Sequence, residues 1–142
     1  MDESQFLSAL RPYYEAFAET DERKRLQLLN AAMTEDAQIW GPKRVFVCHE
    51  QISEKIAGFH QNWPGCRLVL ATGLNIFLNS ARMGGAIVGD DGAIRATGHA
   101  LIELAPDGRI QRVIPFWDAL PPLPAAWPQA LAAPSGRGNS AN

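Results

Sequence analysis

Apolar residues in the first half of the chain recur at helical spacing. In residues 6–17 they fall at steps of three and four, at Phe6, Leu10, Tyr13, Tyr14 and Phe17. One apolar stripe of this kind predicts an amphipathic helix. Pro12 lies inside the stretch, so it either kinks the helix or marks a later start, with proline in the first turn.

Two further helices are expected before residue 66. The acidic segment 20–22 is typical of a helix start, and a second stripe follows at Leu26, Leu29, Ala32 and Met33. A third stripe stands at i, i+4, i+7 and i+11, at Ile52, Ile56, Phe59 and Trp63. Pro64-Gly65 ends this helix. Short strands are expected between the helices, over residues 36–40 and 45–47.

After Gly65 the apolar period changes from helical to strand-like. Strands are predicted over residues 68–76, 82–88, 93–104 and 109–118, with tight turns at 90–92 and 106–108. Consecutive hairpins of this kind make an antiparallel sheet. Helices followed by a strand meander predict an α+β fold, with three N-terminal helices packed on one face of a curved sheet.

Composition and charge narrow the possible partners. The chain has 142 residues, 46% of them hydrophobic, and a net charge of −2, which suits a globular domain. We expect no nucleic-acid partner, because no basic patch stands out. We expect no membrane partner, because no apolar run approaches about 18 residues. Cys48 and Cys66 indicate no disulfide framework, and the acidic N-terminus is unlike a signal peptide, so a cytoplasmic location is expected.

The C-terminal end differs in composition from the rest. Residues 1–124 are expected to form a single domain, and 125–142 a Pro/Ala-rich tail. The last part, residues 135–140, lacks apolar side chains and is predicted to be disordered. Four apolar residues of this region would pack either across the mouth of a pocket or against a partner subunit: Leu120, Leu123, Trp127 and Leu131.

The order of several short segments resembles a known family. These segments are 13–17, 20–21, 35–37, 49–52, 107–110 and 116–118. Together they resemble the SnoaL-like family of the nuclear-transport-factor-2-like superfamily, over residues 5 to 124. The resemblance implies a cystatin-like cone, in which a curved sheet wraps the long helix around a central pocket, and commonly a homodimer. Its members include isomerase-like, cyclase-like and dehydratase-like enzymes as well as domains that only bind or associate.

The resemblance places one oxyanion donor but no acid or base. Isomerase-like members use a tyrosine on the first helix, and that position falls on Tyr13. The positions where relatives place carboxylates fall on Gly41, on Ala100 and near Pro115, none of which can take a proton. General acid–base chemistry needs a titratable group that faces the substrate. Every reaction that the resemblance implies therefore depends on another residue.

Histidines are the candidates for that role. His60 lies beside Phe59 at the edge of the third apolar stripe, where a base would reach the cavity; the alternative is a half-exposed surface histidine. His99 has the opposite strand parity to the apolar set of its strand, which predicts the outer face. His49 is expected to make a local contact at a helix end.

The predicted pocket set is mainly aromatic. It comprises Tyr13, Phe17, Trp40, Phe59, Trp63, Ala100, Val113 and Trp117. Small residues opposite, such as Gly98 and Ala100, would leave room beside the rings, which suits a flat apolar ligand. The alternative is a closed, fully packed core.

Two function classes remain open at this point. The first is a cofactor-independent isomerase, cyclase or lyase acting on a hydrophobic cyclic metabolite, with Tyr13 polarising an oxygen and His60 moving a proton. The second is a non-catalytic domain that binds a ligand or dimerises. The spacing of Cys48, His49, His60 and Cys66 matches no zinc pattern, so neither a metal nor a cofactor is expected.

Overall fold

The structure is a computed structural model that describes residues 1–134. The elements of this part follow the predicted order of helices and strands. They are α1 (Glu3–Ala18), α2 (Glu22–Ala32), β1 (Met33–Trp40), β2 (Val45–Val47), α3 (Cys48–Asn62), β3 (Arg67–Phe77), β4 (Ser80–Val88), β5 (Ile94–Leu104), β6 (Ile110–Phe116) and a 3₁₀ turn at Gln129–Leu131. The α+β class is therefore confirmed.

Side chains at the helix starts explain the first two boundaries. Asp2 accepts a hydrogen bond from the backbone nitrogen of Gln5 at 3.0 Å, and the Gln5 side chain accepts one from the Asp2 nitrogen at 2.8 Å. This capping box starts α1 nine residues before Pro12, so the later start is excluded and Pro12 lies within the helix. Asp21 caps α2 through the backbone nitrogen of Lys24 at 3.0 Å, as the acidic segment predicted.

Within the described residues, the strands form one six-stranded sheet in the order β2-β1-β6-β5-β4-β3. The expectation of a wholly antiparallel sheet is wrong at one pair, because β1 and β6 run parallel. A parallel pair needs a long connection. Here the connection is supplied by α3 and the β3–β5 meander, which returns the chain beside β1. The hairpin turns contain Gly92 and Gly108 at φ 82° and 89°, where predicted.

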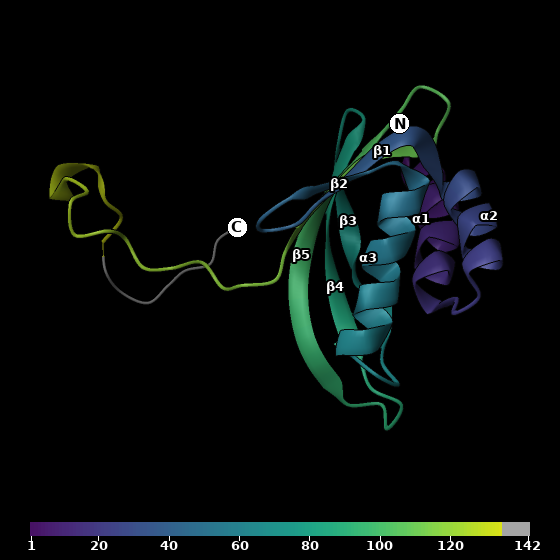
Figure 1. The fold of residues 1–142 in the computed structure, drawn as a ribbon. Helices are drawn as coiled ribbons and strands as arrows, with labels where there is room; N and C mark the ends of the chain where they lie inside the picture. Colours follow the sequence, from purple (N-terminus) through teal and green to yellow (C-terminus); the bar gives the residue numbers. More distant parts are fainter. Residues whose placement is uncertain (135–142) are drawn as a thin grey trace.

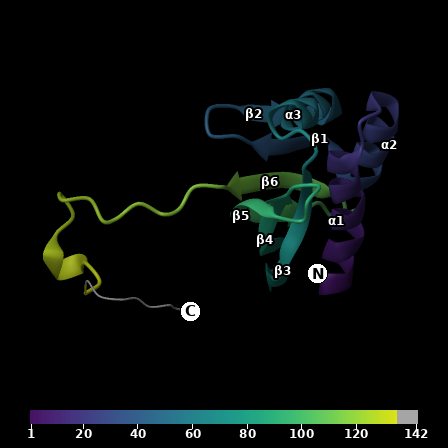
Figure 2. The same cartoon turned by 90° about the horizontal axis from the view of Figure 1, so that it is seen from below.

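The helices lie on the concave side of the sheet: α3 packs against β1 and β2, α1 packs against β3, and α2 lies outside them (Figure 1 and Figure 2). One source of the curvature is a register shift in β3 between Leu70 and Leu74. There the Thr72 hydroxyl accepts a hydrogen bond from the Gly84 nitrogen at 2.7 Å. Such a bulge bends a strand and increases its twist. The core fills the concave side with Phe6, Leu10, Leu29, Met33, Ile39, Ile52, Ile56, Ile102, Leu104, Ile110 and Val113.

A buried arginine joins the three helices. Arg25, the last residue of the basic run 23–25 in α2, is only 5% exposed. Its Nε donates to the Ser53 hydroxyl at 2.8 Å, and a terminal nitrogen donates to the Glu19 carbonyl at 3.0 Å. Because Glu19 caps the end of α1, the cation also stabilises the negative end of that helix dipole.

The segment after β6 projects away from the sheet (Figure 2). Its apolar side chains are exposed, at 94% for Leu120, 58% for Leu123, 47% for Trp127 and 68% for Leu131. These side chains therefore do not pack across the mouth of the pocket. Their packing against a partner subunit remains a prediction. The predicted disorder of residues 135–140 falls outside the described residues. No helix within residues 1–134 has the length and apolar character needed to cross a membrane.

Candidate functional site

A cavity of about 600 Å³ lies between α3, α1 and the concave face of the sheet. It runs from Asn62, Pro42 and the 41% exposed Trp117 at the surface to the buried side chains of Tyr13 and Ile39. Its wall is completed by Phe17, Phe46, Lys55, Gly58, Phe59, Trp63, Leu68, Ile87, Ala96 and Pro115. The cavity is therefore mostly apolar and rich in aromatic rings.

Helical and strand periods explain which side chains reach this cavity. Lys55 and Phe59 are four residues apart on one side of α3, and Trp63, the C-cap residue of the helix, continues the same wall. On the opposite wall, Pro115 and Trp117 share strand parity with the buried Val113. The edges of the aromatic rings on α1 and α3 meet, since the centroids of Phe17 and Phe59 are 5.9 Å apart.

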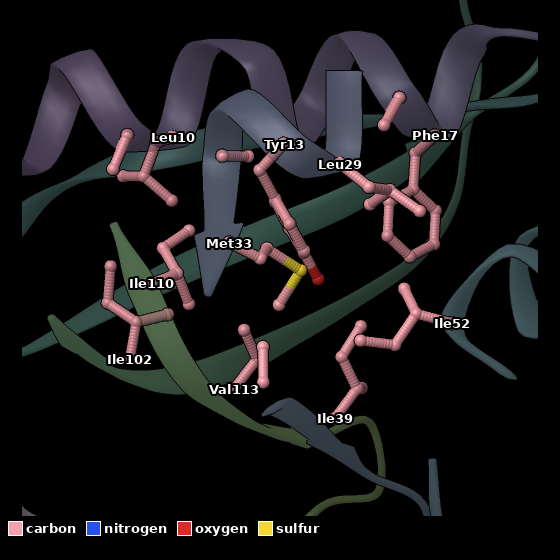
Figure 3. Packing of buried hydrophobic residues seen from close by; sticks show 14 of the residues in the cluster. Leu10, Tyr13, Phe17, Leu29, Met33, Ile39, Ile52, Ile102, Ile110 and Val113 are labelled. Atoms are coloured by element: carbon pink, nitrogen blue, oxygen red, sulfur yellow. The ribbon is translucent and has the colours of Figure 1, made fainter. Parts of the chain in front are cut away.

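Tyr13 occupies the inner end of the cavity. Its phenol points from α1 into the interior, toward Met33 and Val113 (Figure 3). The residue is 5% exposed, and no side chain or backbone group of residues 1–134 makes a hydrogen bond to its hydroxyl. Burial, and then the nearby Tyr14, raise the pKa of Tyr13 well above its ordinary value. The phenol is therefore neutral at physiological pH and available as a hydrogen-bond donor.

A second, smaller cavity of about 40 Å³ adjoins the first. The two share Tyr13, Leu68, Pro115 and Trp117, and the smaller one adds Ala100 and Val113. Gly98 also borders it and lies against the Trp117 ring: a Cβ at Gly98 would be 2.7 Å from Trp117 Cε3. The small residues of β5 therefore make room for the indole, as well as for the cavity.

The structure brings together seven of the residues predicted from the sequence. Five line the larger cavity, namely Tyr13, Phe17, Phe59, Trp63 and Trp117, and Ala100 and Val113 border the smaller one. Trp40 is the exception. Alternation along β1 buries Ile39 and turns Trp40 outward, where it is 39% exposed and donates to the Gln38 side chain at 2.9 Å.

His60 does not reach the cavity, so its expected role as base lacks the geometry. It lies seven residues after Ser53, on the side of α3 that meets Arg25 of α2, and its ring packs on Phe59 at 5.6 Å between centroids. Within the described residues its Nε2 is buried without a hydrogen-bond partner. A helix turns about 100° per residue, which carries His60 off the wall that Phe59 forms.

The other two histidines have the positions that the pattern predicted. His99 belongs to the exposed set of β5 and pairs with Phe116 of β6, although it also borders the smaller cavity. His49 Nε2 lies 3.2 Å and 3.0 Å from the carbonyl oxygens of Met33 and Thr34. Since both partners are acceptors, Nε2 carries the proton, and His49 joins the start of α3 to β1.

Sequence reasoning missed the polar residues of the wall, above all Lys55. Its ammonium lies 4.9 Å from the centroid of the Phe46 ring, a cation–π distance. Burial lowers the pKa of Lys55 below its ordinary value. The signal was present in the spacing, because Lys55 precedes the predicted cavity residues Phe59 and Trp63 by four and eight positions.

A curved sheet that wraps a long helix over an apolar cavity defines the cystatin-like, nuclear-transport-factor-2-like class of proteins. The chain is 28% identical to a candidate isomerase of the SnoaL-like family from Agrobacterium tumefaciens strain C58, over 82% of this chain and 99% of that one, with a TM-score of 0.73. The chain has the fold of the nuclear-transport-factor-2-like superfamily and is similar to its SnoaL-like members.

Two further solved structures support the fold alone. A protein of unknown function with a cystatin-like fold from Methylobium petroleophilum PM1 is 16% identical, with coverage of 89% and 83% and a TM-score of 0.66. A candidate SnoaL-like polyketide cyclase from Jannaschia sp. CCS1 is also 16% identical, with coverage of 82% and 87% and a TM-score of 0.65. No sequence-family model matches the chain, and no curated protein matches it.

Proposed function

We propose that the protein binds a small, hydrophobic, cyclic metabolite in the larger cavity and isomerises, cyclises or dehydrates it without a cofactor. The observation that carries this proposal is the Tyr13 hydroxyl, which lies at the inner end of an aromatic cavity and has no hydrogen-bond partner within residues 1–134. A volume of about 600 Å³ falls in the range of small-molecule sites. Similar structures include a candidate isomerase and candidate polyketide cyclases, which supports this reaction class.

The chemistry proposed for Tyr13 is polarisation of a ligand oxygen. A neutral phenol in a low-dielectric cavity donates one hydrogen bond, and that bond strengthens as negative charge develops on a carbonyl oxygen. The rings of Phe17, Phe59 and Trp117 provide flat apolar surface for the ligand body. This arrangement positions a substrate and polarises its oxygen. Removing the Tyr13 hydroxyl should therefore have a measurable effect on turnover.

Replacing Tyr13 with phenylalanine is expected to lower turnover about 100-fold, the usual effect of removing one oxyanion donor. Stability should hold, since the lost hydroxyl has no partner among residues 1–134. Tyr14→Phe is the matched control, because Tyr14 packs edge-on against Tyr13 at 5.4 Å between centroids but does not line the larger cavity. Unchanged turnover in Tyr13→Phe would rule out the catalytic role.

Substrates for that assay come from a thermal-shift screen. The purified protein is tested against steroids, terpenoids, polyketide-like aromatics and small ring acids. A ligand that binds only the folded state raises the melting temperature by mass action. A shift confined to one chemical class supports the proposed pocket and names the compounds to assay, whereas no shift across all classes counts against it.

A second candidate function is a binding or association domain without catalysis. It is favoured by the absence of Asp, Glu and His from the wall of the larger cavity within the described residues. The outer face of the sheet also exposes Leu101 and Phe116, at 41% and 55%. Apolar side chains on one sheet face favour a homodimer through that face. Sedimentation equilibrium across a concentration series tests this homodimer, and a monomer at all concentrations would exclude the dimer.

The remaining expectations about partners and location are part of the same proposal. We place the protein in the cytoplasm, with a small molecule and a second copy of itself as partners and neither nucleic acid nor membrane. Support for this location comes from Cys48 and Cys66, which are both free thiols. Fractionation of cells with an antibody against the protein tests the location directly.

A further inference from the structure

Lys55 is the charged residue of the larger cavity. Every other described residue of that wall is apolar or carries a neutral polar group. Lys55 is half-buried, and its ammonium lies over the Phe46 ring of β2, at 4.9 Å from the centroid. The packing therefore holds a positive charge at one wall of an otherwise apolar space.

This charge has no counter-ion within residues 1–134. The ion pairs of the described residues all use arginines, at positions 11, 95, 109 and 112. Partial burial of an ammonium without an anion has a free-energy cost, which also explains why the pKa of Lys55 is lowered. A ligand that brings a negative oxygen removes this cost on binding.

Aromatic side chains connect Lys55 with Tyr13 along the wall of the cavity. Phe59 stands one helical turn after Lys55 and packs on Phe17, and Phe17 packs on Tyr13 at 5.1 Å between centroids. Lys55 and Tyr13 thus border the same cavity, with the aromatic side chains of Phe17 and Phe59 between them.

We propose that the cavity selects hydrophobic ring compounds that carry an anionic oxygen, such as a carboxylate or phenolate, and that Lys55 is the residue that selects them. This inference rests on the proposed function, because it assigns the ligand class of the same cavity. Charged hydrogen bonds are about twice as strong as neutral ones, so the charge decides between ligands of similar size and shape.

The test uses two fluorescent probes of nearly the same shape, anilinonaphthalene sulfonate and its neutral counterpart phenylnaphthylamine. Lys55→Met removes the charge and keeps most of the side-chain volume, and Lys55→Arg keeps the charge. Lys24→Met is the matched control, because Lys24 is an exposed lysine of α2 outside the cavity and its loss changes the net charge equally. Gly58→Trp, which fills the cavity, shows whether the probes bind there.

We expect Lys55→Met to weaken binding of the anionic probe about tenfold, as for loss of one charged hydrogen bond. Binding of the neutral probe should be unchanged, Lys55→Arg should retain the anionic probe, and Lys24→Met should affect neither. The inference is overturned if Lys55→Met weakens both probes equally, or weakens neither, while Gly58→Trp still abolishes binding. Probes that fail to bind, or that bind equally to Gly58→Trp, overturn the proposed pocket itself.

Discussion

Replacing Gly58 with tryptophan is expected to abolish ligand binding and to leave the fold intact. Gly58 lies on the α3 wall of the larger cavity, and a Cβ at this position would meet no atom within 4 Å. The indole therefore enters open space instead of displacing the core. We expect affinity for any cavity ligand to fall at least about 100-fold, equivalent to about 2.7 kcal/mol. Titration calorimetry or probe fluorescence measures this loss.

Gly58→Ala separates filling of the cavity from the change in helix propensity. Glycine inside a helix is less favourable than alanine by about 1 kcal/mol. Gly58→Ala should therefore raise the melting temperature by about 3 °C and leave affinity unchanged, because one methyl group blocks little of the cavity. Wild-type affinity in a folded Gly58→Trp protein would show that the ligand binds elsewhere.

The parts of the fold that local chemistry determines were predictable. Helix starts at Asp21 and turns at Gly92 and Gly108 follow from capping and from left-handed backbone, and both depend on a few adjacent residues. The parallel pairing of β1 with β6 depends on residues about 75 positions apart, such as Ile39 and Val113. Hydrophobic alternation is the same for a parallel and an antiparallel neighbour, so no local pattern distinguishes them.

Local pattern likewise explains which residues of the candidate site were predictable from the sequence. Tyr13, Phe59 and Trp117 were placed correctly because periodicity assigns a side chain to the core face of its own element. Trp40 and His60 each follow a residue that faces the cavity, Ile39 or Phe59, and a single step along the chain rotates the side chain to another face. Lys55 was missed because a charged residue is usually taken as solvent-facing, although its spacing matched the cavity face.

The cavity's dependence on close packing is greatest at Gly98 of β5. A Cβ at Gly98 would lie 2.6 Å from the Phe116 carbonyl oxygen and 2.7 Å from Trp117 Cε3. The first of these atoms belongs to the backbone of β6, so a rotamer change of the indole alone does not relieve the overlap. The strands must separate locally and Trp117 must leave its place on the cavity wall. Gly98→Ala should therefore damage stability and the ligand site together.

We expect Gly98→Ala to destabilise the protein by about 3 kcal/mol, at the upper end for overpacking by one methyl group, and so to lower the melting temperature by about 10 °C. The matched control is Gly85→Ala. Gly85 pairs directly with Gly98 across β4 and β5, but its Cβ would approach only the Val69 carbonyl oxygen, at 3.6 Å. That substitution should be neutral or slightly stabilising, because alanine lowers the entropy of the unfolded chain. Equal melting temperatures for the two variants would mean that β6 and Trp117 do not lie against Gly98 in solution. Trp117 would then not form this part of the cavity wall.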